Sequence, residues 1–384
     1  MGIRLYVGDD LERLAERLAG LLRKHRPGDP FSGQRVVVPS LGMRHWLARR
    51  LADKSGICAN IEFVFPADFI RHCVSISKST ARYEGESMTW RLLGLLGKTS
   101  LKEPARYVAE DPTQVKAFGL AKRLAKLFDH YLLYRPEFFE SWPAKTDHPD
   151  APWQQELWRE ICDDTQEPHP AKARAAFLES LKPAGEEPVI LFGMGNLPPE
   201  YLKILQALAT VQEVHLLVTQ PTEEIWDDLL SVRDQWRQHK STGSLLPKSP
   251  NGHPLLVSLG RTGQEFHQQL LTIAEEGEWD ETFFRKKPGG TLLAELQADL
   301  CRVDLPPREG RKAPVDDSLQ VHSCHSPLRE VEVLHDQLLH LFQARTDLAP
   351  HEVVVMTPDI EAYAPLIRAV FDNPESQHLK IPYT

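Results

Sequence analysis

The sequence of 384 residues predicts an α/β fold in which a parallel sheet is interrupted by a helical insertion. Short apolar runs such as Val36–Val38 and Val189–Phe192 alternate with segments of helical periodicity, which is typical of βαβ units with parallel strands. Between Ala67 and Leu181 the chain shows helical patterns without a strand signal. We therefore expect an all-helical insertion at about residues 95–184.

Composition and charge are those of an ordinary globular protein. Hydrophobic residues make up 41% and charged residues 26%, and no stretch approaches the roughly 20 apolar residues that cross a bilayer. The N-terminal segment lacks the apolar core of a signal peptide, so we expect a cytoplasmic protein with no membrane association. The net charge of -9 argues against a general basic coat for nucleic acid but allows a local basic surface.

The five cysteines indicate neither a disulfide framework nor a zinc ribbon. They are scattered, odd in number, and no two have CxxC spacing. One compact cluster, His322–His325, lacks a second pair of ligands, so the sequence predicts no metal site.

The first strand and helix occupy the position of the phosphate-binding loop in nucleotide-hydrolysing α/β domains. Arg4–Val7 is predicted to be a strand, and a helix follows from Leu11 to about Lys24. A phosphate-binding loop needs glycine amides, a lysine, and a serine or threonine for magnesium. The connecting loop Gly8–Asp10 has one glycine and two carboxylates instead, whose charge would repel a triphosphate. We therefore predict that this loop does not bind ATP in the usual way.

The second β-α unit carries the first candidate nucleic-acid contacts. Pro39 ends the strand because it cannot donate to a central ladder, and Ser40 and Gly42 open a helix whose unpaired amides attract anions. That helix repeats apolar residues at one-turn spacing: Met43, Leu47 and Leu51. His45 and Arg49 point away from this stripe and could face a polyanion. An ordinary unit with a solvated basic face explains the same residues, so both interpretations stay open.

The clearest helix of the insertion has two distinct faces. It is predicted to begin at Asp111–Pro112, a capping residue followed by proline in the first turn. Its apolar face, repeating at about 100° per residue, comprises Phe118, Ala121, Leu124, Ala125, Phe128, Tyr131 and Leu132. A second face about four turns long is basic and comprises Lys116, Arg123, Lys126 and His130. The basic face is either a solvated surface or a track along a phosphate backbone.

Further apolar runs complete the first predicted sheet. Phe63 and Phe65 alternate as on a strand, and Val189–Phe192 and Val214–Thr219 are typical of buried strands. In a helicase, Asp-Glu at the end of the Val189–Phe192 strand would hold magnesium. Gly193–Asn196 carries no carboxylate, so the metal-binding half of an ATPase site is missing as well as the phosphate cradle.

The last third of the chain is predicted to hold several helices and the start of a second α/β domain. Helices are expected at about residues 225–237, 263–276 and 291–301, and a linker at Arg302–Pro314. Strands are expected at Leu319–Ser323 and Val353–Met356, with helices at 327–342 and 360–371. Two strands do not make an independent sheet of usual size, so the sequence is expected to end inside that second domain. The predicted domains are 1–94 with 185–312, the insertion 95–184, and 315–384.

Several stretches in order along the whole chain resemble one protein family. They are Gly56–Phe63, Pro66–Ile70, Ser87–Trp90, Leu127–Pro136, Leu197–Leu202, Asn251–Gly260, Cys324–Leu339 and Val354–Tyr363. On these residues the chain resembles the N-terminal part of the RecC family, the gamma subunits of bacterial exodeoxyribonuclease V. The resemblance implies a superfamily 1 helicase-like fold that has lost its ATPase motifs, in agreement with the two loops above.

The resemblance also implies a DNA-guiding role without catalytic residues. Family members work in double-strand-break repair with a RecB-like helicase-nuclease and a RecD-like helicase, bind single-stranded and forked DNA, and scan for a short G-rich Chi signal. No cofactor is implied for this chain, because ATP and Mg²⁺ are used by the partner subunits. The candidate DNA-binding residues are Pro39, Ser40, Leu41, Gly42, His45, Arg49, Phe65, Arg71, Lys126, Leu127, Asp129, His130 and Arg135.

The candidate residues follow the family pattern in part. Leu127, Asp129 and Arg135 keep the family residue, whereas proline, leucine and positive charge replace several polar or acidic residues elsewhere. These replacements favour general single-strand binding over reading of the usual Chi octamer, and Phe65 could stack on a base.

Two other functions stay open at this point. A scaffold that only docks partner subunits would tolerate charge reversal at Lys126 and Arg49. An active ATPase or nuclease would need a phosphate loop and metal-binding carboxylates, which Gly8–Asp10 and Gly193–Asn196 do not provide.

Overall fold

The fold is given by a computed structural model. It describes residues 2–29, 31–74, 81–96, 102–109, 113–142, 152–163, 170–179, 181, 187–224, 226, 229, 252–273, 280–285, 289–303, 312, 314–372 and 380–383. The chain divides into two compact units. Unit 1 comprises Met1–Pro288 and Leu296–Gly310, and unit 2 comprises Gly289–Glu295 and Arg311–Thr384.

Unit 1 is built on a parallel sheet. Among the described residues its strands are β1 (Ile3–Gly8), β2 (Gln34–Val37), β3 (Ile61–Val64), β4 (Val189–Met194), β5 (Val214–Thr219) and β6 (Glu281–Phe283). They lie in the order β3-β2-β4-β5-β1-β6, and every neighbouring pair is parallel. The predicted α/β fold class and its parallel strands are therefore confirmed. The short edge strand β6 was not predicted.

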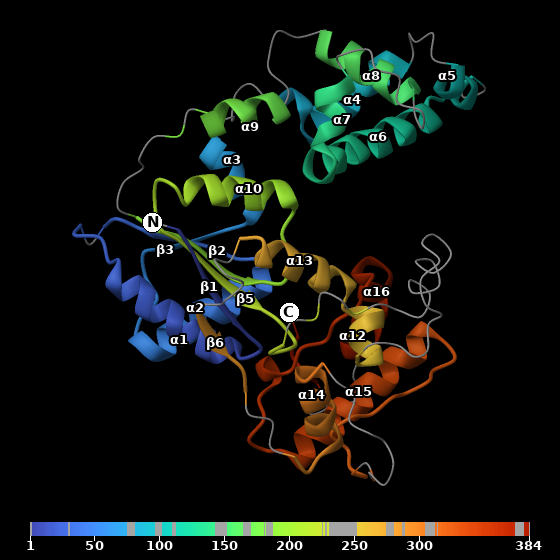
Figure 1. Ribbon diagram of the computed structural model, residues 1–384. Coiled ribbons are helices and arrows are strands. Elements are labelled where there is room, and N and C mark those ends of the chain that lie inside the picture. Colours follow the sequence, from blue (N-terminus) through green and yellow to red (C-terminus); the bar gives the residue numbers. More distant parts are fainter. Residues whose placement is uncertain are drawn as a thin grey trace, which may run out of the picture. The chain divides into compact units, whose positions relative to one another are not determined.

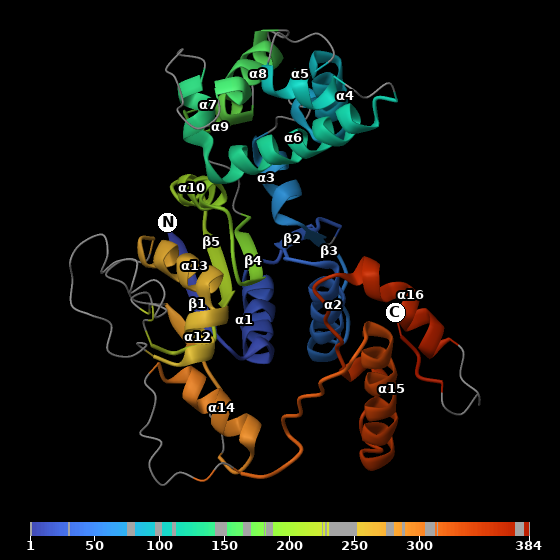
Figure 2. The same ribbon diagram turned by 90° about the vertical axis from the view of Figure 1, so that its right-hand side faces the viewer.

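Helices cover both faces of this sheet, as Figures 1 and 2 show. One face carries α1 (Leu11–Lys24) and α2 (Leu41–Ser55), and the other carries α3 (Pro66–Val74), α10 (Pro199–Leu208) and α13 (Arg261–Leu271). Successive strand residues point to opposite faces. Tyr6, Val36 and Ile190 pack under α1 and α2, whereas their neighbours Leu5, Val37 and Leu191 pack under the other layer. Burial on both faces explains why the strands are continuous apolar runs rather than alternating ones.

Helix α2 forms as its sequence predicts. The Ser40 side chain caps it by accepting a hydrogen bond from the Met43 amide over 3.2 Å. Leu47 and Leu51 are buried, and Met43 packs beside them in the same core. Gly56, with φ +75°, ends the helix in the left-handed region that suits glycine.

The insertion is a helical cluster with its own core. It contains α4 (Gly85–Leu96), α5 (Lys102–Val108), α6 (Val115–Tyr134), α7 (Pro136–Ser141) and α8 (Pro152–Asp163). The Phe128 ring lies at its centre, with ring centroids 5.5 Å from Trp158, 6.1 Å from Phe139 and 6.2 Å from Trp142. Buried residues of this core run from Tyr83 to Ile161, so it begins before the predicted boundary at 95. The domain boundaries themselves stay a prediction.

Helix α6 differs from its prediction at its N-terminus. It begins at Val115, because Gln114 has φ +58° in the left-handed region and the helix cannot run through it. The predicted start at Asp111 is therefore wrong, and Asp111–Pro112 itself lies outside the described residues. Most of the predicted apolar face is buried, but Phe118 is exposed and its ring lies 5.5 Å from that of Trp90.

The helical cluster is attached to the sheet layers through α10 and α9 (Pro170–Glu179). The C-terminal part of α6 contacts α10, and Leu133 packs against the core beneath α10. Phe177 and Leu178 of α9 pack against the same core. The last two turns of α6 are therefore held by the sheet layers as well as by the helical cluster.

The remainder of unit 1 agrees in part with the predicted helices. α13 lies where a helix was expected at 263–276. α14 (Leu292–Cys301), whose first four residues are assigned to unit 2 and the rest to unit 1, lies where a helix was expected at 291–301. Most of the helix predicted at 225–237 lies outside the described residues. A short helix, α12 (Pro254–Leu259), contributes Leu256 to a small core with Trp226.

Unit 2 has helices where they were predicted but lacks the predicted strands. α15 (Pro327–Ala344) and α16 (Ile360–Phe371) pack together through Val331, Leu338 and Phe371. The predictions of strands at Leu319–Ser323 and Val353–Met356 are wrong: the described residues there form no ladder, and Val321 and Met356 are 91% and 88% exposed. A parallel strand needs hydrogen-bonding neighbours and cover on both faces. The described part of unit 2 supplies neither to these segments.

None of the described helices is both long and apolar enough to cross a membrane.

Replacement of Gly8 by alanine tests the close approach of β1 and β6. A Cβ atom there would overlap the carbonyl oxygen of Phe283, which accepts the Asp10 amide hydrogen over 3.1 Å. We expect Gly8→Ala to lower the free energy of unfolding by about 1–3 kcal/mol, measured by urea denaturation. Gly20→Ala is the matched control, because only the end of Arg17 lies near that position, at 4.0 Å. It should raise stability by up to about 1 kcal/mol, and equal effects of the two changes would contradict the close approach.

Candidate nucleic-acid interface

The loops that follow the strands meet at one edge of the sheet. Because the strands are parallel, their carboxyl ends share this edge, which is where α/β proteins bind ligands. Here it carries Gly8–Asp10 after β1, Pro39 and Ser40 after β2, Phe65 after β3, and Gly195–Pro198 after β4. We call it the carboxyl edge.

In the loop after β1, the Asp10 side chain takes the position at the start of α1 where a phosphate would bind. Asp10 caps α1 by accepting hydrogen bonds from the amides of Glu12 and Arg13, over 3.1 and 3.2 Å. Arg285, which follows β6, forms an ion pair with Asp10 at 3.2 Å. The Arg285 amide also donates a hydrogen bond of 2.8 Å to the Asp9 carboxylate. A helix N-terminus commonly binds phosphate, but at α1 a carboxylate already takes that place.

Asp10 and Arg285 each shift the pKa of the other toward the charged form. Burial would raise the pKa of Asp10, but the hydrogen bond and charge of Arg285 and the bonds from the two α1 amides hold that pKa below its ordinary value. The hydrogen bond from Arg285 to Asp10 likewise raises the pKa of the guanidinium. The pair is therefore ionised at neutral pH. It was not predicted from the sequence, because its two members are 275 residues apart.

The predicted residues of the second β-α unit are all exposed at the carboxyl edge or on α2. This edge group comprises Pro39, Ser40, Leu41, Gly42, His45 and Arg49, together with Phe65 after β3. Leu41, His45 and Arg49 follow one another at intervals of four residues, so they form one exposed strip along α2. Beneath the strip, the Trp46 ring stacks on Phe192 with centroids 6.3 Å apart. The strip is therefore supported by the core of the sheet.

Helix α6 presents a second exposed strip. Lys122, Lys126, His130 and Tyr134 are exposed and follow at intervals of four residues, each step about 6 Å of helix rise. We call these four residues the α6 stripe. The His130 and Tyr134 rings lie edge to face at 6.4 Å. Lys122 and Tyr134 were not among the predicted residues, although their spacing of four from Lys126 and His130 would have identified both.

The remaining predicted residues lie around the stripe. Asp129 is exposed, Leu127 is half-buried against the helical core, and Arg135 follows α6 with its guanidinium 3.5 Å from the Glu137 carboxylate. Arg71 on α3 forms ion pairs with Asp68 at 3.1 Å and Glu84 at 3.6 Å.

Tyr201 on α10 marks the place where these elements converge. Burial raises the pKa of its hydroxyl, the charges of Arg174 and Arg71 lower it, and that of Asp129 raises it. Charged groups from α3, α6 and α9 thus surround one buried side chain of α10.

Within the described residues, no hydrogen bond or ion pair joins the edge group to the α6 stripe. That the two groups line one surface stays a prediction.

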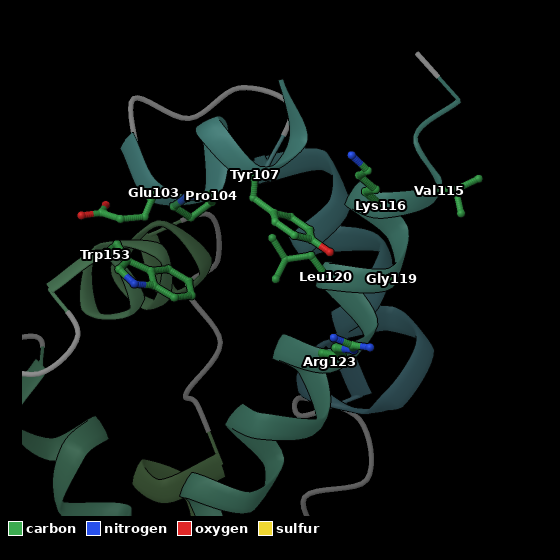
Figure 3. Close-up of a pocket in the computed structure, with 9 residues that line it drawn as sticks. All are labelled: Glu103, Pro104, Tyr107, Val115, Lys116, Gly119, Leu120, Arg123 and Trp153. Atoms are coloured by element: carbon green, nitrogen blue, oxygen red, sulfur yellow. The ribbon is translucent and has the colours of Figure 1, made fainter. Parts of the chain in front are cut away.

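A pocket of about 410 Å³ lies beside the first turns of α6. Figure 3 shows the rings of Tyr107 and Trp153 and the Leu120 side chain around it, with Lys116 and Arg123 on the α6 side. Its lining comes from α5, α6 and α8. No pattern in the sequence indicated this pocket, because its residues come from three separate helices whose packing the sequence does not show.

Comparison with known proteins identifies the family. A family model described as RecC, N-terminal domain, matches residues 3–303. The chain belongs to the RecC family. Three relatives named RecBCD enzyme subunit RecC match nearly the whole chain: 32% identity for Escherichia coli strain K12, 33% for Mycolicibacterium smegmatis and 30% for Haemophilus influenzae. The matches cover 99%, 97% and 99% of this chain, and 39%, 34% and 40% of those RecC proteins. The chain thus spans at most two-fifths of the length of these relatives.

Substitution of Asp10 tests the capped loop. Asp10→Ala removes both the helix cap and the ion pair, so we expect it to lower the free energy of unfolding by about 0.5–2 kcal/mol. Asp10→Asn keeps an acceptor for the α1 amides but loses the charge, and should cost less. Because the pKa of Asp10 is lower in the folded chain, the contribution of its charge is present above about pH 4 and is lost as the pH falls through the folded pKa.

Urea denaturation at pH 7 and pH 3 measures this effect. The difference between the wild-type chain and Asp10→Asn should shrink at pH 3. Asp53→Asn, on the exposed side of α2, is the control and should change stability by less than about 0.5 kcal/mol at either pH. A difference for Asp10→Asn that does not depend on pH would contradict the role of the charge.

Proposed function

We propose that this chain is the part of a RecC-type subunit that guides single-stranded DNA without catalysing a reaction itself. The observation that supports it most directly is the α6 stripe. Lysines and a histidine repeat along one exposed side of the helix and end at an exposed tyrosine. Proteins usually bind single-stranded nucleic acid through cationic side chains placed along its phosphate backbone and aromatic rings on which its bases stack.

The edge group extends this proposal to a second surface. Ser40 and Gly42 lie at the start of α2, where backbone amides favour phosphate, and His45 and Arg49 continue along the same helix. Phe65 is 39% exposed at the neighbouring strand end and offers a ring to a base. In this proposal the two surfaces contact successive parts of one strand, including a Chi-type signal.

The proposed lack of nucleotide chemistry rests on the loop after β1. Asp10 accepts the α1 amides that would bind a phosphate, and Arg285 neutralises it. After β4, the loop Gly195–Pro198 offers no carboxylate for magnesium. We propose that ATP and Mg²⁺ are used by partner subunits in a double-strand-break repair complex in the cytoplasm.

The names of the relatives support a proposal about partner subunits. Those proteins are named as subunits of a RecBCD enzyme, and we propose that this chain likewise assembles with RecB-like and RecD-like subunits on forked DNA.

A docking scaffold without DNA contact is the second candidate. The pocket beside α6, together with the exposed Trp90, Val115 and Phe118, offers apolar surface to a protein partner. Charge reversal at Arg49 and Lys126 in the assembled complex separates the two functions. A scaffold assembles and works normally with both changes, whereas a DNA guide assembles normally but binds the strand more weakly.

Fluorescence anisotropy with a labelled oligothymidylate tests DNA binding by the chain. We expect binding that weakens with salt. Arg49→Ala and Lys126→Ala each take away one cation that faces a phosphate, so each should reduce the slope of log K against log salt by about 0.7. Tyr134→Ala should weaken binding about five- to 150-fold if the ring stacks on a base.

Arg23→Ala is the control for these variants. It changes an exposed arginine of α1 outside both groups and should leave the affinity for the oligonucleotide unchanged. No binding at low salt, or an equal effect of Arg23→Ala, would refute the proposal.

Thermal unfolding tests the absence of a nucleotide site. ATP with Mg²⁺ should leave the midpoint temperature of the chain unchanged, because a ligand that binds only the folded state would raise it. A raised midpoint or measurable ATP turnover would contradict the proposal for the loop after β1.

A further inference from the structure

Three potential metal ligands meet at the amino edge of the sheet, opposite the carboxyl edge. His25 directly follows α1, Glu213 directly precedes β5, and His215 is the second residue of β5. Both imidazole Nε2 atoms lie 3.4 Å from the same oxygen, Oε2 of Glu213. One ligand atom from each residue lies within 4.8 Å of the others.

The two ring nitrogens lack other partners. The His215 side chain is 3% exposed, and the partner of its Nε2 among the described residues is the Glu213 carboxylate at 3.4 Å, which is also 3.4 Å from the buried Nε2 of His25. A buried polar atom without a partner is costly and is normally satisfied by protein, water or an ion. Here two buried ring nitrogens share one carboxylate oxygen at 3.4 Å, which is too long for a good hydrogen bond to either.

We propose that His25, Glu213 and His215 bind a zinc ion. Two imidazoles and one carboxylate, with the fourth position left to water, are an established zinc donor set. With zinc-ligand bonds of about 2.0–2.1 Å, tetrahedral ligands are separated by about 3.3–3.4 Å. Both Nε2–Oε2 distances, 3.4 Å, equal that separation. The Glu213 side chain is 47% exposed, which leaves the site accessible to the ion and to water.

The surroundings of His215 fit a ligand role. Its second ring nitrogen, Nδ1, lies 3.2 Å from the Tyr6 hydroxyl oxygen. If Nδ1 donates its proton to that oxygen, the lone pair is on Nε2, facing the site, and such outer contacts orient metal-bound histidines. The Arg17 guanidinium lies over the Tyr6 ring, 4.9 Å from its centroid, and holds the tyrosine in place.

The site would have a structural effect that does not depend on DNA binding. It joins the end of α1 to the start of β5, two elements separated by most of unit 1 in sequence. A bound ion would stabilise the folded chain by linkage. The alternative is that Glu213 only forms ion pairs with His25 and His215 when these histidines are protonated.

Titration of the metal-free chain with ZnCl₂ tests the proposal. We expect one tight site per chain and a rise in the midpoint temperature that MgCl₂ does not reproduce. His25→Gln and Glu213→Gln, both at partly exposed positions, should fold and should weaken zinc binding by at least about tenfold. His72→Gln, which changes an exposed histidine on α3, is the matched control and should bind zinc like the wild-type chain.

Cobalt(II) supplies a readout that distinguishes this site from the cysteines. The bound ion should show the visible absorption of tetrahedral nitrogen and oxygen ligands, without a thiolate charge-transfer band, and His25→Gln should abolish that absorption. Equal zinc affinity in the wild-type chain and both ligand variants would overturn the proposal. A thiolate band would do so too, as would binding that His72→Gln weakens to the same extent.

Discussion

The structure of unit 1 depends on the requirement that a parallel sheet be covered on both faces. The ladder of β1, β2, β4 and β5 buries apolar side chains in two directions, so one layer of helices cannot complete it. α1 and α2 supply one layer, and α3, α10 and α13 supply the other. This arrangement brings the strand ends together at two edges. Both sites that we propose on the sheet follow from that, because each edge collects residues from several parts of the chain.

At the carboxyl edge, electrostatics distinguishes the loop after β1 from a phosphate-binding loop. The amides at the start of α1 are a natural phosphate site, but they already donate to Asp10, and Arg285 balances the resulting negative charge. A triphosphate would have to displace this ion pair and approach two carboxylates. Exposed basic side chains lie instead on α2, whose first turn has no carboxylate, and along α6. The first turn of α2 therefore presents no carboxylate that would repel a phosphate.

Helix α6 shows which features the spacing of apolar residues predicts and which it does not. The apolar face of α6 was predicted correctly from Ala121 to Leu132, because a spacing of three and four residues selects one face of any helix. Phe118 fits the same spacing, yet it lies beyond the packed part of the core and is exposed. The start of α6 was also misplaced, because the backbone conformation of Gln114 decides it rather than a capping signal.

Local patterns along the chain were sufficient to predict the α/β class, the parallel strands, the stripe of Met43, Leu47 and Leu51, and the loss of phosphate-binding residues at Gly8–Asp10. Each of these is encoded in a short run of residues whose propensity and spacing can be read directly. The strand order, the pairing of Asp10 with Arg285, and the meeting of His25 with Glu213 and His215 became visible only in the folded chain. The same is true of Leu319–Ser323 and Val353–Met356, which form no ladder. These outcomes depend on which distant segments become neighbours, and contacts across the fold leave no local pattern in the chain.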